Sequence, residues 1–125
     1  MERTLLRQHL ITGKQAENSA LKFLQAKGFK LIVQNFRCKV GEIDLIMEDK
    51  KFWVFIEVRY RKNNNYGLGL ETVNKMKQQR LIRAATFYLQ QQNLLGKVDC
   101  RFDIISFNGN KIDWIKNAFD GNSNG

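Results

Sequence analysis

Two acidic residues lie on neighbouring segments that are both typical of β-strands. Asp44 lies in GEIDLI (41–46), and Glu57 lies in FWVFIEVRYR (52–61). If a two-residue loop at Lys50–Lys51 joins the strands, Asp44 lies directly opposite Glu57, with Cβ atoms roughly 5 Å apart. Two such carboxylates repel, and a hard divalent cation such as Mg²⁺ or Mn²⁺ would neutralise them, bind a phosphodiester and activate water. The spacing therefore permits metal-dependent phosphodiester chemistry, although on its own it is a weak pattern.

This prediction depends on the register of the hairpin. A loop at Asp49–Lys50 would slide Asp44 opposite Phe55, and a one-residue slip would put the two carboxylates on opposite faces of the sheet. Side chains alternate between the two faces of a strand, so in the segment 41–46 Glu42 and Asp44 are expected on one face and Ile43 and Leu45 on the other. The alternative is an ordinary solvated face on which Arg59 or Arg61 pairs with one carboxylate.

A third carboxylate, Glu17, lies at the edge of the inward face of a predicted helix. The hydroxyl of Thr12 can cap this helix while Gln15 reaches back, and Gly28 offers a left-handed stop. The apolar residues that recur at helical spacing are Ala16, Ala20, Phe23 and Leu24. Because the helix must pack on the sheet, Glu17 could reach the Asp44–Glu57 region. A surface position in the first turn, which favours acidic residues, is equally open.

The elements that must position these residues follow from the periodicity of the chain. Strands are expected at 29–38, 41–48, 52–61, 100–107 and 111–116, and a long helix from about Leu70 to Gln92. The order α-β-β-β-α-β-β predicts a single mixed α/β domain over residues 12–119, with helices packed on the sheet. Residues 1–11 are expected to form an N-terminal arm, and 120–125 a flexible tail.

Size and charge narrow the class of protein. The chain has 125 residues, 43% of them hydrophobic, which suffices for one domain with one core. Its formal net charge of +9 favours a polyanionic partner, with nucleic acid as the first candidate. No apolar run could span a bilayer and no signal-peptide core is present, so we expect a cytoplasmic protein without a membrane partner.

Cysteine and histidine usage argues against other chemistries. Cys38 and Cys100 are isolated, and His9 is the sole histidine, so a Cys/His zinc site is not expected. We therefore expect both cysteines to be reduced, buried thiols of a cytoplasmic protein. His9 lies in the predicted arm without an identifiable partner, and no general-base role is assigned to it.

Basic residues cluster on the long predicted helix and before it. Lys75, Gln79 and Arg83 share one helical stripe, which Lys77 and Arg80 flank. The expected nucleic-acid contacts are Arg59, Arg61, Lys62, Tyr66, Lys75, Gln78, Arg80 and Arg83. Tyr60 and Tyr66 could stack on unpaired bases. Alternatively, the lysines only solvate an outer helix face and the tyrosines belong to the core. No residue here is typical of base-specific recognition, so we expect binding directed to backbone or shape.

Several separated motifs resemble one protein family. GEIDLIMEDKKFWVFIEVRYR, followed by YG, KQ, RLIRAATFYL and CRFDIISF…WIKNAF, resembles the YraN family over about residues 13–119. The resemblance implies a restriction-endonuclease-like fold. It also implies a relation to the PD-(D/E)xK nuclease superfamily and its Holliday-junction resolvases, which often act as dimers. The resemblance therefore raises a homodimer as one option.

The resemblance assigns roles to individual residues. It matches Asp44 to the metal-binding aspartate, Glu57 to the second acidic ligand, and Glu17 to the helix glutamate of some resolvase-like members. Val58 would lend its backbone carbonyl to the ion. Arg59 occupies the position of the motif lysine, whose usual role is to orient or help activate the attacking water.

Arginine at that position departs from the motif. Arg59 stays protonated, so it cannot act as a base at neutral pH, although it can hold a phosphate with two hydrogen bonds. The superfamily sometimes moves the lysine to a neighbouring element, and Lys77 is a candidate for that role. Position 59 thus supports phosphate binding more firmly than catalysis.

Three functions fit these observations. The leading hypothesis is a Mg²⁺- or Mn²⁺-dependent nuclease acting on DNA, on branched or single-stranded intermediates, and leaving a 5′-phosphate, as the resemblance implies. The second is a nucleic-acid-binding module of repair or recombination that lacks catalysis. The third is an interaction protein whose charge serves solubility. Salt-sensitive binding to nucleic acid separates the first two from the third.

Overall fold

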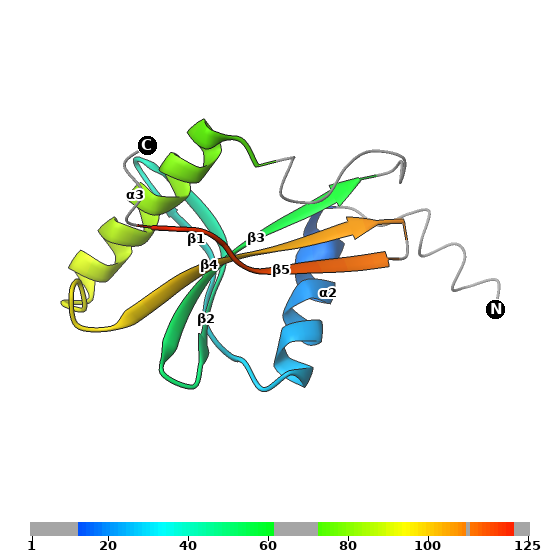
Figure 1. The fold of residues 1–125 in the computed structure, drawn as a ribbon, viewed down its shortest axis with the longest axis horizontal. Coiled ribbons are helices and arrows are strands. Elements are labelled where there is room, and N and C mark those ends of the chain that lie inside the picture. The colour runs from blue at the N-terminus through cyan, green and yellow to red at the C-terminus, as the bar shows by residue number, and fades with distance from the viewer. Residues whose placement is uncertain (1–12, 62–72, 110, 122–125) are drawn as a thin grey trace.

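The order of helices and strands is the predicted one (Figure 1). The computed structural model describes residues 13–61, 73–109 and 111–121. In chain order its elements are α2 (Gly13–Ala26), β1 (Lys30–Cys38), β2 (Gly41–Asp49), β3 (Phe52–Arg61), α3 (Lys75–Gln91), β4 (Asp99–Asn108) and β5 (Lys111–Phe119). The predicted arm, Thr12 and residues 122–125 lie outside the described residues.

The strands form one five-stranded sheet in the order β1-β2-β3-β4-β5. Neighbouring strands are antiparallel except for β3 and β4, which run parallel because the chain crosses over through α3 between them. This single α/β domain with a mixed sheet confirms the predicted fold class.

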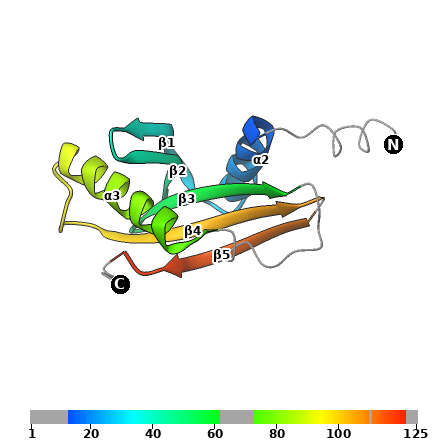
Figure 2. The ribbon, with the colours of Figure 1, turned by 90° about the horizontal axis from the view of Figure 1, so that it is seen from above.

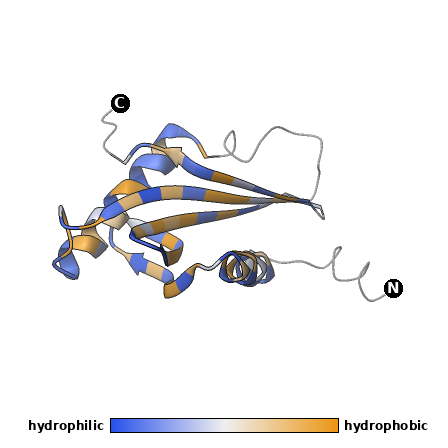
Figure 3. Ribbon diagram, turned by 60° about the horizontal axis from the view of Figure 1, so that its bottom comes forward, coloured by the Kyte–Doolittle hydropathy of each residue, from blue (hydrophilic) through white to orange (hydrophobic). Residues whose placement is uncertain are grey.

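The sheet separates two hydrophobic clusters, each covered by one helix. Figures 1 and 2 show α2 and α3 at different sides and ends of the central strands. The α3-side cluster includes Ile43, Ile46, Phe55, Leu81, Ala84 and Tyr88. The α2-side cluster includes Ala16, Ala20, Leu24, Leu45, Ile56 and Ile105. Because both faces of the sheet are packed, β2 and β4 carry continuous runs of buried residues, and Figure 3 shows hydrophobic bands interrupted by hydrophilic ones along the long strands. Any side chain at the border of the two clusters can meet groups from both helices.

Helix α2 ends at the predicted glycine. Gly28 has φ +98, and its N–H donates to the Gln25 carbonyl at 3.0 Å. The N–H of Phe29 donates to the Leu24 carbonyl, also at 3.0 Å, which completes a Schellman motif. This stop turns the chain into β1 and fixes the end of the helix that carries Glu17.

Helix α3 begins later than the sequence indicates. It starts at Lys75 rather than near Leu70, because Asn74 is extended (φ −73, ψ 175) and its side chain accepts a hydrogen bond from the Lys77 N–H at 2.9 Å. Val73 is buried as predicted, but it precedes the helix. The cap places Lys77 in the first turn of α3.

The hairpin between β2 and β3 has the register on which the acidic pair depends. Asp49 pairs with Phe52, so Lys50 and Lys51 form the two-residue loop, and Lys50 has φ +57. The ladder continues to the pair Leu45 and Ile56. One further step brings Asp44 level with Glu57, as predicted for this loop.

The prediction of strict alternation along β2 is wrong at Asp44. Ile43 packs in the α3-side cluster together with Ile46, whereas Leu45 packs in the α2-side cluster. The opposite strand has the same break, because Asn35 of β1 adopts φ +58. Asn tolerates this left-handed conformation better than most residues. Asp44 therefore lies where both strands change the face that they present to each helix.

The two cysteines differ from each other. Both are free thiols, and Cys38 is half-buried. Cys100 is exposed, so the expectation of a buried thiol is wrong there, because Cys100 lies at the start of β4, before its buried stretch begins. Among the described residues, no helix combines the length and the apolar character needed to cross a membrane.

Candidate active site

Asp44 is a buried carboxylate at the end of the β2–β3 ladder. Its exposed fraction is 9%, and its Oδ2 accepts a hydrogen bond from the Val58 N–H at 2.8 Å. Burial raises the pKa of Asp44, although this hydrogen bond and one from Glu17 act in the opposite direction. The Val58 amide thus holds one carboxylate oxygen of Asp44 beside β3.

Glu57 of β3 is also buried, and two cations reach it. Its exposed fraction is 5%, and its Oε2 lies 3.5 Å from both Lys77 Nζ and Arg59 Nη1. Burial and then the charge of Asp44 raise the pKa of Glu57 to about 7, although Lys77 and Arg59 oppose the rise. The effect of Asp44 means that the two carboxylates interact across the register described above.

Glu17 of α2 is the third carboxylate of this cluster. It is half-buried, and its Oε1 is buried without a hydrogen-bond partner among the described residues. Burial, the charge of Asp44 and a hydrogen bond to Asp44 raise the pKa of Glu17, while a hydrogen bond from Asn35 lowers it. A carboxyl group that donates to a neighbouring carboxylate holds a proton between them. The side chain of Glu17 therefore reaches Asp44 from helix α2.

We call Glu17, Asp44 and Glu57 the acidic cluster. All three pKa values are raised, and each of the three carboxyl groups feels the charge or the hydrogen bond of another member. Lys77 and Arg59 are the two cations that the ion pairs bring to Glu57. Such an arrangement takes up protons, or another positive charge, because burial and repulsion both penalise three ionised carboxylates.

The donor set suits a hard divalent cation, which prefers carboxylate and carbonyl oxygens. In the described part of the chain, however, no group of three or more His, Cys, Asp or Glu side chains is arranged to hold a metal ion. The predicted metal site is smaller than such a group, because it consists of two acidic side chains, Asp44 and Glu57, and the backbone carbonyl of Val58. The unpartnered Glu17 Oε1 is a further oxygen donor beside this set. The residues therefore fit such an ion by the chemistry of their donors.

The raised pKa of Glu57 predicts a pH dependence of stability in metal-free buffer. A carboxyl group with a raised pKa in the folded chain stabilises the fold below its unfolded value, and this contribution disappears as the pH rises through the folded value. For Glu57 the window runs from 4.5 to about 7. We expect the free energy of unfolding to fall across this window by on the order of 1–3 kcal/mol more in the wild type than in Glu57→Gln.

Urea unfolding with EDTA at a series of pH values measures this difference. Glu48→Gln, at a partly exposed position of the same sheet, is the matched control and should follow the wild type. Parallel curves for the wild type and Glu57→Gln would show that Glu57 has an ordinary pKa.

Only some of the residues that we expect to contact nucleic acid lie next to the acidic cluster. Lys77 and Arg59 reach Glu57, and Lys75, Arg80 and Arg83 are exposed on α3. Gln78 donates its side-chain amide to the Val73 carbonyl at 3.0 Å, so it closes the start of the helix. The side chain of Arg61, together with Lys62 and Tyr66, lies outside the described residues.

Tyr60 and the tryptophans belong to the packing of the sheet. Tyr60 is half-buried against the α2-side cluster, which favours the core alternative considered for it. Trp114 packs edge-on against Phe23 and Phe29, with ring centroids 5.8 and 5.6 Å apart. Trp53 lies near Tyr88, at a centroid distance of 6.3 Å. These rings join helices to strands.

Sequence reasoning missed three residues near the site. Asn35 donates to Glu17, and Arg37 and Lys39 line a cleft opposite the first turns of α3. The charge run FRCK (36–39) before Gly41 was a local signal for the two cations. Nothing local indicates that this run faces α3, because the contact is made across some forty residues of the chain.

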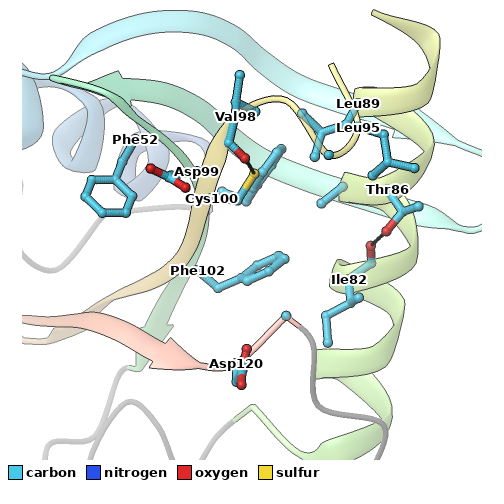
Figure 4. Close-up of a pocket in the computed structure, with 14 residues that line it drawn as sticks. Phe52, Ile82, Thr86, Leu89, Leu95, Val98, Asp99, Cys100, Phe102 and Asp120 are labelled. Carbon is cyan, nitrogen blue, oxygen red and sulfur yellow. Dashed lines mark hydrogen bonds between the residues drawn. The ribbon is translucent and has the colours of Figure 1, made fainter. Parts of the chain in front are cut away.

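A cavity of about 360 Å³ lies elsewhere, between α3 and the start of β4. Figure 4 shows Phe102, Leu89 and Ile82 around it, with Asp99 and Cys100 at one side and Asp120 at another. Its lining includes no residue of the acidic cluster, nor Arg59 or Lys77. The two features are therefore separate, and the cavity contributes nothing to the candidate site.

The fold and the acidic cluster define a single α/β domain with a buried carboxylate site between two helices and a mixed sheet. The family model described as "Uncharacterised protein family UPF0102" matches residues 16–107. The chain therefore belongs to the UPF0102 family, also called YraN, as the resemblance of its motifs predicted.

Curated relatives match over most of both chains. A UPF0102 protein of Pseudomonas fluorescens is 44% identical over 116 residues, which cover 91% of this chain and 97% of the relative. One of Legionella pneumophila is 47% identical over 110 residues, with 86% and 93% covered. One of Klebsiella pneumoniae is 50% identical over 109 residues, with 86% and 85% covered. These names state the family alone.

Proposed function

We propose that this protein is a metal-dependent nuclease that hydrolyses phosphodiester bonds of DNA at the acidic cluster. The observation that carries the proposal is the convergence of Asp44 and Glu57 next to Lys77 and Arg59. Burial raises the pKa values of both carboxyl groups, and the charge of Asp44 adds to the rise at Glu57. The resemblance of the family to the PD-(D/E)xK superfamily supports the same chemistry.

Each residue has a part in this proposal. Asp44, Glu57 and the Val58 carbonyl would hold Mg²⁺ or Mn²⁺. When bound, such an ion supplies positive charge against the phosphate and acidifies water. Arg59 binds a phosphate oxygen, and Lys77 orients the attacking water through its ammonium N–H groups. Glu17 keeps a proton between itself and Asp44, and it releases that proton when positive charge replaces it.

The test is a cleavage panel of linear, single-stranded, flapped and four-way DNA with Mg²⁺ or Mn²⁺. We expect cleavage of at least one branched or single-stranded substrate that EDTA stops, and that Asp44→Ala and Glu57→Ala both lack. A second readout is independent of cleavage: added metal should raise the thermal midpoint of the wild type and leave that of the two variants unchanged. Metal that neither stabilises the wild type nor supports cleavage would refute the proposal.

A second function has an observation in its favour. Glu57 Oε2 already pairs with both Lys77 and Arg59, and arginine stands where a nuclease of this superfamily has lysine. A nucleic-acid-binding module of repair or recombination, without catalysis, fits these pairs. It would bind DNA in EDTA with a strong salt dependence and cleave no member of the panel.

The two cations near Glu57 have different expected roles in cleavage. Lys77→Ala should lower the cleavage rate by about 10²–10³-fold, because its ammonium group can orient water and stabilise negative charge that develops on the phosphate. Arg59→Ala should mainly raise the DNA concentration that gives half of the maximal cleavage rate, because a guanidinium binds phosphate but does not act as a base. Single-turnover rates at several DNA concentrations separate the two effects.

Lys97→Ala removes the same charge at an exposed position outside the candidate site and serves as the control. If Lys77→Ala leaves the rate unchanged while Arg59→Ala abolishes cleavage, Lys77 has not taken over the role of the motif lysine.

A further inference from the structure

A basic cleft opens next to the acidic cluster. It has a volume of about 490 Å³ and lies between the turn that joins β1 to β2 and the first turns of α3. Its charged lining consists of Arg37, Lys39, Lys77, Arg80 and Glu42. We call this feature the basic groove. Lys77 belongs both to the groove and to the pair with Glu57, so the groove leads directly to the carboxylates.

Backbone packing keeps the two walls of the groove close. A Cβ atom added to Gly41 would lie 3.3 Å from the backbone oxygen of Arg80, which is tighter than ordinary contact. The glycine therefore lets the β1–β2 turn approach the helix. The groove is consequently a permanent feature of the packing between β2 and α3.

The charge of the groove selects an anionic ligand. Four cations face one acidic residue, Glu42, which lies 3.8 Å from Arg37 in an exposed ion pair. An exposed pair of this kind is weak, so it does not neutralise Arg37 firmly. Cations spread along a groove that ends at Glu57 suit a chain of phosphates better than one isolated anion.

Two exposed apolar side chains accompany the cations. Val40 lines the groove and is 43% exposed, and Met76 is 61% exposed. Met76 lies one turn before Arg80 on α3, and its Sδ is 3.6 Å from Arg80 Nη2. Apolar side chains beside phosphate-binding cations suit unstacked bases, which a duplex keeps in its interior.

The size of the groove also disfavours a duplex. A cube with a volume of about 490 Å³ has an edge of about 8 Å, which is too narrow for a duplex, because the two backbones of B-DNA are already separated by a major groove about 12 Å wide. One nucleic-acid strand can enter such a space with its phosphates on the cations.

We propose that the basic groove binds a single-stranded segment of nucleic acid and leads it toward the acidic cluster. This inference deepens the proposed function and rests on it for the direction of the strand, but the binding itself requires neither metal nor cleavage. The proposed substrate is thus a flap, gap or end with an unpaired strand, rather than an intact duplex.

The test is a binding titration by fluorescence anisotropy in EDTA, with an oligothymidylate, an oligouridylate and a duplex of equal length. The variant Arg37→Ala/Lys39→Ala is compared with Lys97→Ala/Lys111→Ala, which loses the same charge at exposed positions outside the groove. The groove variant should bind a single strand at least about tenfold more weakly than the control variant. Its salt slope should fall by about 1.4, for two phosphate contacts.

The apolar pair has its own signature. Val40→Ala/Met76→Ala should weaken single-strand binding by about fivefold and leave the salt slope unchanged, because no phosphate contact is lost. All the replaced side chains are exposed at the surface, and equal thermal midpoints verify that each variant is folded.

The outcomes separate this inference from the proposed function. Duplex binding as tight as single-strand binding, or a groove variant that binds like its control, would overturn the inference even if the protein cleaves DNA. Preferred single-strand binding that the groove variant loses would support it even if the protein cleaves nothing. Binding of the oligouridylate as well as the oligothymidylate supports the same groove, and shows that it accepts RNA.

Discussion

Replacement of Asp44 by asparagine should abolish metal-dependent cleavage, with a loss of about 10³-fold or more in rate. Asparagine keeps the shape of the side chain. It also keeps an oxygen that can accept the hydrogen bond that the Val58 N–H donates to Asp44 at 2.8 Å. It removes the negative charge that a hard cation requires. The loss therefore reports on the charge of Asp44 rather than on its place in the fold.

The same variant should be more stable than the wild type in metal-free buffer at pH 8. Burial raises the pKa of Asp44, so the ionised carboxylate is disfavoured in the folded chain at this pH. A neutral side chain avoids that penalty, and we expect a gain of about 1 kcal/mol or more, equivalent to a few degrees in the thermal midpoint. A residue whose removal stabilises the fold while ending activity is typical of a functional site.

Single-turnover cleavage and thermal unfolding with EDTA measure the two effects. Asp99→Asn, an exposed change of the same type, is the control and should alter neither. A cleavage rate within tenfold of the wild type would mean that Asp44 is not a metal ligand, whatever its effect on stability.

The second large effect is expected at Asp103, a buried carboxylate that does not belong to the acidic cluster. Its exposed fraction is 1%, and it accepts hydrogen bonds from four donors. These are Arg101 Nε at 3.0 Å, Arg101 Nη2 at 3.2 Å, Trp114 Nε1 at 3.0 Å and the Asn117 N–H at 2.9 Å. Asp103→Ala would leave two nitrogens of a largely buried guanidinium, Arg101 Nε and Nη2, and two further donors without their acceptor. We expect a loss of about 3–5 kcal/mol in the free energy of unfolding.

Urea unfolding measures this loss directly. Asp49→Ala removes the other carboxylate near Arg101, at 3.3 Å and closer to solvent, and should cost only about 1 kcal/mol. If the two variants lose equal stability, the buried network around Asp103 is not what joins β4 to β5.

Residues close together in the sequence indicated two of the features that position the site. The two-residue loop at Lys50–Lys51 was one of the registers that the pattern of the two strands allowed, and the pairing of Asp49 with Phe52 selects it. Gly28 indicated the end of α2, because a left-handed residue after a helix is a backbone requirement. Both features depend on residues close together in the sequence.

What could not be predicted depends on backbone conformation or distant contacts. The apolar spacing before α3 continues through Val73, so the pattern hides the cap at Asn74, which no glutamate follows three residues later. The positive φ of Asn35 has no sequence signature beyond asparagine itself, yet Asn35 lies level with Asp44, where the alternation of β2 breaks. Arg37 and Lys39 matter only because Gly41 lies against Arg80.

The origin of the groups around Asp44 has a consequence for the newly made chain. Glu17 comes from one helix and Lys77 from the other, and the strands that hold Asp44 and Glu57 lie between them. A folding intermediate in which either helix is undocked lacks part of this set. On the proposed function, such an intermediate would be inert toward DNA, and the ability to cut would arise only at the last step of assembly.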